Sequence, residues 1–141
     1  MKRTITILLI LFISVSMYSQ ADQTVGFEDG FLLYWWTSID AEGDGFIWFH
    51  SYSDTYDGSY SAGSQSYVPG GTGAVDPDNY LITPQLVLGE NEELTYMVKA
   101  GPPPYSYDKY GIFISTSGNG EDDFIELSTT TLGSGNWVSK S

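Results

Sequence analysis

Beyond residue 21, the chain contains no long stretch in which apolar residues recur at the 3.6-residue period of an amphipathic helix. Short segments rich in aromatic and β-branched residues are separated instead by glycine, proline, serine and acidic residues, which favour turns. The clearest segment is Glu93–Ala100, where Leu94, Tyr96 and Val98 occupy alternate positions and so lie on one face of an extended strand. The pattern predicts an all-β fold.

Seven segments have the length and composition of short strands, and turn residues separate them. This arrangement predicts a jelly-roll β-sandwich of antiparallel strands. Aromatic residues make up 16% of the chain, and we expect rings such as Trp35, Trp36, Trp48 and Phe113 to pack between the sheets. Besides Glu93–Ala100, the expected strands are Thr24–Glu28, Phe46–Tyr52, Tyr60–Tyr67, Tyr80–Val87 (interrupted by Pro84), Tyr110–Ser115 and Phe124–Thr131.

The first 20 residues have the features of a secretory signal peptide. Lys2 and Arg3 precede the apolar run Ile5–Val15, and Ser19-Gln20-Ala21 has small residues where a signal peptidase would cut. A membrane anchor would need about 20 apolar residues, and this run is shorter. We therefore expect a signal peptide at 1–20, a single exported domain at 21–141, and no membrane insertion after cleavage.

The charge of the exported part is strongly negative. All 18 acidic residues lie beyond residue 20, where only three lysines oppose them, for a net charge of −15. Such a surface repels a phosphate backbone, so we expect no nucleic-acid partner. The chain has no cysteine, which excludes disulfides and thiolate chemistry.

Three acids alternate with small residues in the loop Asp40–Gly45, which reads D-A-E-G-D-G. Oxygen ligands at such spacing are typical of calcium-binding loops. An EF-hand would need a glutamate at the twelfth position, where this chain has Ser51. A solvated acidic turn without metal is the alternative interpretation.

The chain shows no catalytic constellation. His50 is the single histidine and lies in the aromatic stretch W-F-H-S-Y, where a packing role is more common than that of a general base. No serine lies in a G-x-S-x-G motif, and acids are too numerous for any one pair to indicate glycoside hydrolysis. We therefore expect no enzyme activity.

Several motifs occur in a characteristic order. They are F-E-x-G from Phe27, W-x-x-I-D-A-x-G-D-G from Trp36, S-Y-S-A from Ser59, D-N-Y-L-I-T-P from Asp78, and Y-G-I-F-I-S-T-S-G from Tyr110. Together they resemble the cleaved adhesin domain of gingipain-type hemagglutinin/adhesin regions, related to choice-of-anchor J domains. The resemblance covers about Val25 to Trp137.

The resemblance implies a jelly-roll sandwich, structural calcium and an adhesive, non-catalytic role on the outer surface of a Gram-negative bacterium or in its secretions. Carried over onto this sequence, it gives Glu28, Asp40 and Asp44 as metal ligands, with Glu42 where the family often has aspartate. We also expect the last strands of the domain to lie beyond Ser141, and many members of the family rely on a separate C-terminal sorting domain.

The ligand is expected to be an extracellular protein or a glycan. Tyrosines in turn-rich segments offer flat rings on which a sugar could stack, and we select Tyr105 and Tyr107 as candidate ligand-binding residues. Two alternatives remain at this point: a carbohydrate-binding module, or a structural spacer attached to a larger secreted hydrolase or protease.

Overall fold

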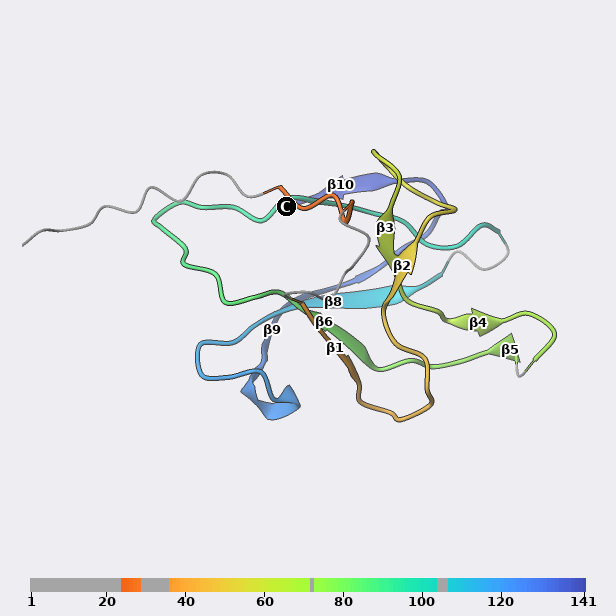
Figure 1. Ribbon diagram of the computed structural model, residues 1–141, viewed down its shortest axis with the longest axis horizontal. Helices are drawn as coiled ribbons and strands as arrows, with labels where there is room; N and C mark the ends of the chain where they lie inside the picture. The colour runs from red at the N-terminus through yellow and green to blue at the C-terminus, as the bar shows by residue number, and fades with distance from the viewer. Residues whose placement is uncertain (1–23, 29–35, 72, 104–106) are drawn as a thin grey trace, which may run out of the picture.

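The computed structural model describes residues 24–28, 36–71, 73–103 and 107–141 (Figure 1). The expected signal peptide at 1–20 and the candidate residue Tyr105 lie outside these ranges. Within them, no helix has the length and apolar character needed to cross a membrane.

The described residues form ten strands and one short 3-10 helix, η1 (Glu121–Asp123). Every strand pair is antiparallel, as predicted. Five pairs are formed: β1 (Thr37–Asp40) with β6 (Asn79–Ile82), β2 (Phe49–Ser51) with β3 (Ser61–Gly63), β4 (Tyr67–Val68) with β5 (Gly73–Ala74), β7 (Tyr96–Val98) with β10 (Val138–Lys140), and β8 (Lys109–Ile114) with β9 (Ile125–Thr131).

Several strand predictions need correction. Thr24–Glu28 is not a strand: Phe27 has a φ of 61°, which ends the extended backbone there. The segment Tyr60–Tyr67 divides into β3 and the start of β4. The segment Tyr80–Val87 ends as a strand at Ile82, and residues 83–88 are exposed, because Pro84 cannot donate to a ladder.

The long hairpin β8–β9 matches the sequence prediction most closely. Its register runs from Lys109 opposite Thr131 to Ile114 opposite Ile125, with a bulge between Ile112 and Phe113. Phe113 was expected in the core but is 39% exposed. Its ring still contacts that of Tyr80 on β6, at a centroid distance of 6.0 Å, so the two strand pairs meet through aromatic side chains.

The core is small. Among the described residues, only Ile82, Ala100 and Leu132 are less than 9% exposed. They lie at the end of β6, just after β7 and just after β9, so three different strand pairs contribute to the core. Hydrogen bonds brace it at Leu132, whose N–H donates to the Asp108 carbonyl at 2.8 Å, while the Asp108 carboxylate accepts from Ser66 Oγ at 2.7 Å.

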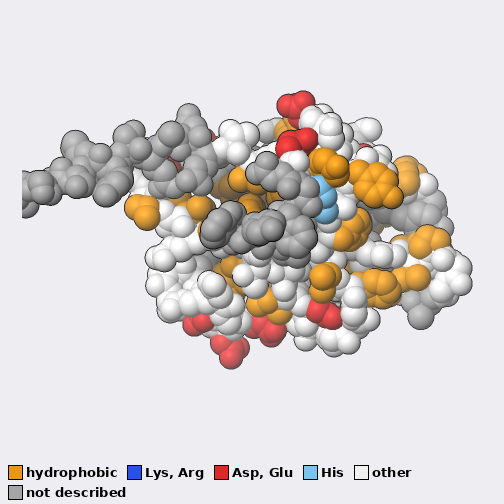
Figure 2. All heavy atoms as spheres, in the orientation of Figure 1, with side chains coloured by type: hydrophobic (Ala, Val, Ile, Leu, Met, Phe, Trp, Pro, Cys, Tyr) orange, Lys and Arg blue, Asp and Glu red, His pale blue; other side chains and the backbone are white. Residues whose placement is uncertain are grey.

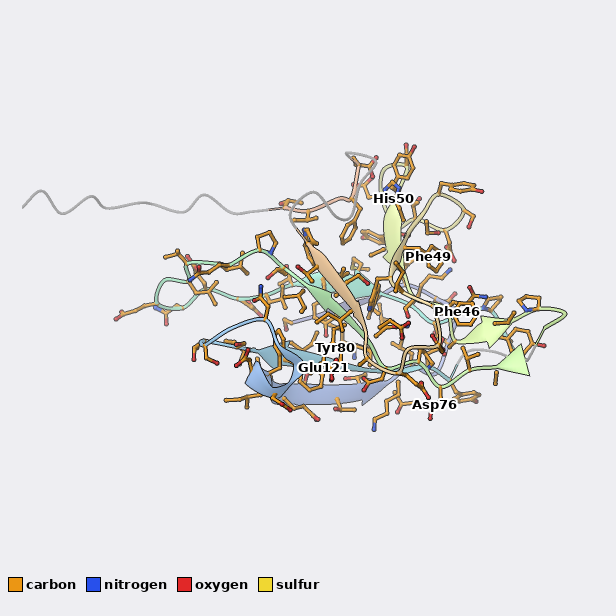
Figure 3. All side chains as sticks on the ribbon, turned by 60° about the horizontal axis from the view of Figure 1, so that its bottom comes forward. Phe46, Phe49, His50, Asp76, Tyr80 and Glu121 are labelled. Carbon is orange, nitrogen blue, oxygen red and sulfur yellow. The ribbon has the colours of Figure 1, made fainter. Side chains whose placement is uncertain are left out.

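Two tyrosines join β7 to β8 inside the fold. The hydroxyls of Tyr96 and Tyr110 lie 3.1 Å apart, and their rings meet edge to face. Burial raises the pKa of Tyr96 to about 12, and the hydrogen bond and charge of Tyr110 add to the effect. Figure 3 shows a second such phenol, Tyr80, beside Glu121 of η1; burial raises its pKa, and the negative charges of Asp78 and Glu121 raise it further.

We expect the stability of the fold to fall at alkaline pH through Tyr96. A folded-state pKa above the ordinary value of 10.0 means that the folded state holds its proton more tightly than the unfolded state. The corresponding stability is complete below pH 10 and is lost as the pH rises towards about 12. Urea unfolding across this range should show the decline in the native protein and a weaker one in Tyr96→Phe. An equal decline in both proteins would assign the effect to other groups.

Candidate functional site

The acidic loop that follows β1 closes on itself through one carboxylate. Asp40 Oδ1 accepts the N–H groups of Gly43 at 2.7 Å and Asp44 at 3.2 Å, and Oδ2 accepts that of Gly45 at 2.8 Å. Gly43 and Gly45 have φ values of 74° and 87°, a conformation that glycine adopts without steric cost. An ionised carboxylate has about four acceptor positions, so these three bonds leave room for a further partner.

The neighbouring acids of the loop face different surroundings. Asp44 Oδ1 accepts the N–H of Phe46 at 2.8 Å, which leaves its second oxygen without a described hydrogen bond. Glu42 borders an open polar depression of about 520 Å³ that Asp76, Pro77 and Asp78 also line. The N–H of Ala41 donates to the Asp78 carbonyl at 3.0 Å, which holds the two sides of the depression together.

Glu28 lies apart from this loop and anchors another one. Its carboxylate accepts the N–H of Ser59 at 2.9 and 3.0 Å and that of Tyr60 at 3.2 Å, so it holds the end of the loop between β2 and β3. Gly58 has a φ of 67°, and any side chain there would collide with this carboxylate. The contact therefore depends on both residues.

The residue before Glu28 is held in a strained conformation. Phe27 has a φ of 61°, which is costly for a bulky side chain. Its carbonyl contacts His50 Nε2 at 2.6 Å, and the His50 ring stacks on that of Tyr60 at a centroid distance of 4.1 Å. His50, labelled in Figure 3, thus packs and bonds within the fold, in agreement with the packing role inferred from the sequence.

Replacing Glu28 with glutamine should loosen the β2–β3 loop. The amide nitrogen cannot accept hydrogen bonds, so one of the two oxygens that bind Ser59 and Tyr60 is lost. These groups are exposed to water, so we expect a loss of about 1 kcal/mol in the free energy of unfolding. Hydrogen exchange at the Ser59 and Tyr60 amides should accelerate. Glu90→Gln, at an exposed acid without a described hydrogen bond, is the matched control and should change neither quantity.

The four predicted metal ligands are divided between two places. Asp40, Glu42 and Asp44 belong to one loop, and Glu28 belongs to the β2–β3 region. Among the described residues, no three histidine, cysteine or acidic side chains converge closely enough to hold a metal ion. The oxygen donors of the Asp40–Gly45 loop suit calcium in kind, and the metal site stays a prediction.

A second surface, which the sequence analysis did not select, lies around the β2–β3 loop at residues 52–60. Tyr52 and Tyr56 are 81% and 60% exposed. Figure 2 shows hydrophobic side chains gathered over this hairpin beside the histidine, with acidic side chains at its tip. Segments distant in sequence complete the surface: Lys99, just after β7, pairs with Asp54 at 2.5 Å, and Trp137, just before β10, meets Tyr56 edge to face at 6.0 Å.

The candidate Tyr107 lies elsewhere in the chain. It is 78% exposed and directly precedes Asp108, whose carboxylate is engaged by Ser66. An exposed ring is therefore present at Tyr107 as expected, and no described ring packs against it as Trp137 packs against Tyr56. The only sequence sign of the second surface was the run of tyrosines and acids between residues 52 and 60.

The sequence is similar to one family of domains and to several proteins that contain it. A family model described as Cleaved Adhesin Domain matches residues 22–141. Hemagglutinin A of Porphyromonas gingivalis is 39% identical over 107 residues, which cover 71% of this chain and 5% of that protein. Gingipain R1 of the same species is 40% identical over 92 residues, which cover 63% of this chain and 5% of that protein. The chain thus spans about a twentieth of the length of these relatives.

A solved structure of the same family has a similar fold. The crystal structure of the K1 cleaved adhesin domain of Lys-gingipain from Porphyromonas gingivalis superposes with a TM-score of 0.73 at 32% identity, covering 82% of this chain and 76% of that one. The match confirms the predicted all-β sandwich of antiparallel strands and agrees with its jelly-roll form.

Proposed function

We propose that this chain, which belongs to the Cleaved Adhesin Domain family, is a non-catalytic adhesive module that binds an extracellular protein or glycan. The observation that carries the proposal is the family match over residues 22–141, and the aromatic surface around residues 52–60 offers a place for a ligand. With the signal-like segment at its start, the module would act after export, in the secretions or on the outer surface of a Gram-negative bacterium.

A non-catalytic role also agrees with the chemistry of the described side chains. His50 is held by Phe27 and Tyr60, and the carboxylates of Asp40 and Glu28 are engaged by backbone N–H groups. These contacts hold loops of the fold in place. In an adhesive module, His50, Asp40 and Glu28 would support the fold and take no part in a reaction.

Calcium forms part of the proposal. The loop Asp40–Gly45 would supply oxygen ligands from Asp40, Glu42 and Asp44, and a bound cation would offset part of the charge repulsion in a chain with 18 acids and five bases. In this proposal, the ion supports the fold and takes no part in a reaction.

Binding by the purified domain tests the adhesive role. Immobilised extracellular matrix and blood proteins, together with a glycan array, should capture the folded domain from solution at physiological salt. The second candidate is a spacer, favoured by the small share of the long relatives that this chain covers. A folded domain that binds neither the immobilised proteins nor the glycans would support the spacer role and contradict the adhesive role.

A further inference from the structure

We propose that the β2–β3 loop, residues 52–60, with Trp137 and Lys99 beside it, forms a binding surface for a neutral glycan. The inference rests on the proposed adhesive function and specifies its ligand class and its location. Three properties of the surface point to this ligand: its exposed rings, its fixed acceptors and its charge.

The loop is rigidly held, although it projects from the fold. Glu28 binds the backbone at Ser59 and Tyr60 on one side. On the other side, Ser61 Oγ donates to the Asp54 carbonyl at 2.7 Å, and Asp54 pairs with Lys99. A loop whose conformation is already fixed loses little entropy when it binds a ligand.

Two aromatic rings are displayed by this loop. Tyr52 and Tyr56 are 81% and 60% exposed, although burial of such rings would stabilise the fold. Trp137 supports Tyr56 from the side, and the Lys99 ammonium lies 5.5 Å from the centre of the indole ring. The apolar C–H face of a pyranose can pack flat on an exposed ring that is held in this way.

Hydrogen-bond acceptors stand next to these rings in fixed orientations. Asp54 Oδ2 is bound by Lys99 at 2.5 Å, which leaves Oδ1 for another donor on a side chain that is 49% exposed. Asp57 Oδ1 accepts the N–H of Gly58 at 2.8 Å, and its Oδ2 has no described partner. In each carboxylate, the bond to one oxygen fixes the orientation of the side chain, and the other oxygen can accept a hydrogen bond from a sugar hydroxyl.

The charge of the surface selects against acidic sugars. Asp54, Asp57 and Glu28 are close in the loop and its anchor, and the one cation described beside them, Lys99, is already paired with Asp54. A sialylated or sulfated glycan would meet like charges there. The two exposed rings of the surface also come from one short loop, whereas a stable protein interface usually buries about 800 Å² on each partner.

The test is a glycan array of neutral and anionic glycans probed with the intact protein and matched variants. Tyr52→Ala and Tyr56→Ala should each weaken binding to neutral glycans about tenfold or more. Tyr56→Phe keeps the ring and should retain most of the binding, and Asp54→Asn should weaken it. Tyr107→Ala removes an equally exposed ring from another segment and should have no effect. Thermal melting of each variant shows that the fold is kept.

Several results of the glycan array would overturn the inference. They are unchanged glycan binding in both loop variants, loss of binding in Tyr107→Ala instead, and a preference for anionic glycans. Binding to immobilised proteins with no glycan bound would also overturn it, while leaving the adhesive function intact. If the folded domain binds neither proteins nor glycans, the adhesive function itself fails, so the two failures are distinguishable.

Discussion

Replacing Leu132 with alanine is expected to lower the free energy of unfolding by about 2–5 kcal/mol, the usual cost of emptying a buried leucine site. Leu132 is 7% exposed and is one of three described residues below 9%, so its side chain forms a large part of a small core. Its backbone is also fixed by the bond to the Asp108 carbonyl, which limits collapse around the cavity. Urea unfolding at neutral pH measures the change.

Leu127→Ala is the matched control for this substitution. Leu127 lies on β9, five residues before Leu132, and is 61% exposed, so the same chemical change removes little buried surface. We expect a change within about 0.5 kcal/mol. If both variants lose the same free energy of unfolding, the core does not lie around Ile82, Ala100 and Leu132.

Strands with a strong local pattern could be predicted from the sequence, and those that depend on distant partners could not. Tyr110–Ser115 and Phe124–Thr131 correspond closely to β8 and β9, because their β-branched and aromatic residues favour strands by themselves. β1 is different: Thr37–Asp40 contains mostly polar residues and becomes a strand by pairing with β6, about 40 residues away. No local pattern marks such a pairing.

The same limit applies to the candidate sites. The self-closed loop at Asp40–Gly45 could be read from its alternating acids and small residues, because the hydrogen bonds that close it on the Asp40 carboxylate are local. The contact of Glu28 with Ser59 spans 31 residues, and Lys99 and Trp137 contact Asp54 and Tyr56 from segments far along the chain. The sequence grouped Glu28 with the acids of the predicted metal loop, whereas in the structure it contacts the loop that carries Tyr52 and Tyr56. Only the tertiary structure shows this contact.

Calcium is expected to stabilise the domain, and the gain should depend on Asp40. A ligand that binds only the folded state adds about 2.7 kcal/mol when its free concentration is roughly 100 times its Kd. Asp40→Asn removes a negative charge from the loop and should abolish most of this gain, measured as the difference in melting temperature with calcium and with chelator. Glu90→Gln removes an exposed acid elsewhere and should retain the gain.

Glu28→Gln separates two roles for the acid that the sequence grouped with the metal ligands. If Glu28 acts only through Ser59 and Tyr60, the variant is less stable with and without calcium, and the calcium-dependent gain is unchanged. If Glu28 binds the ion, the gain itself falls, as in Asp40→Asn. The structure favours the first outcome, because the carboxylate already holds the β2–β3 loop. If calcium does not change the melting temperature of the native protein, the prediction of a calcium site is wrong. The acidic loop would then be a turn that is closed by Asp40 alone.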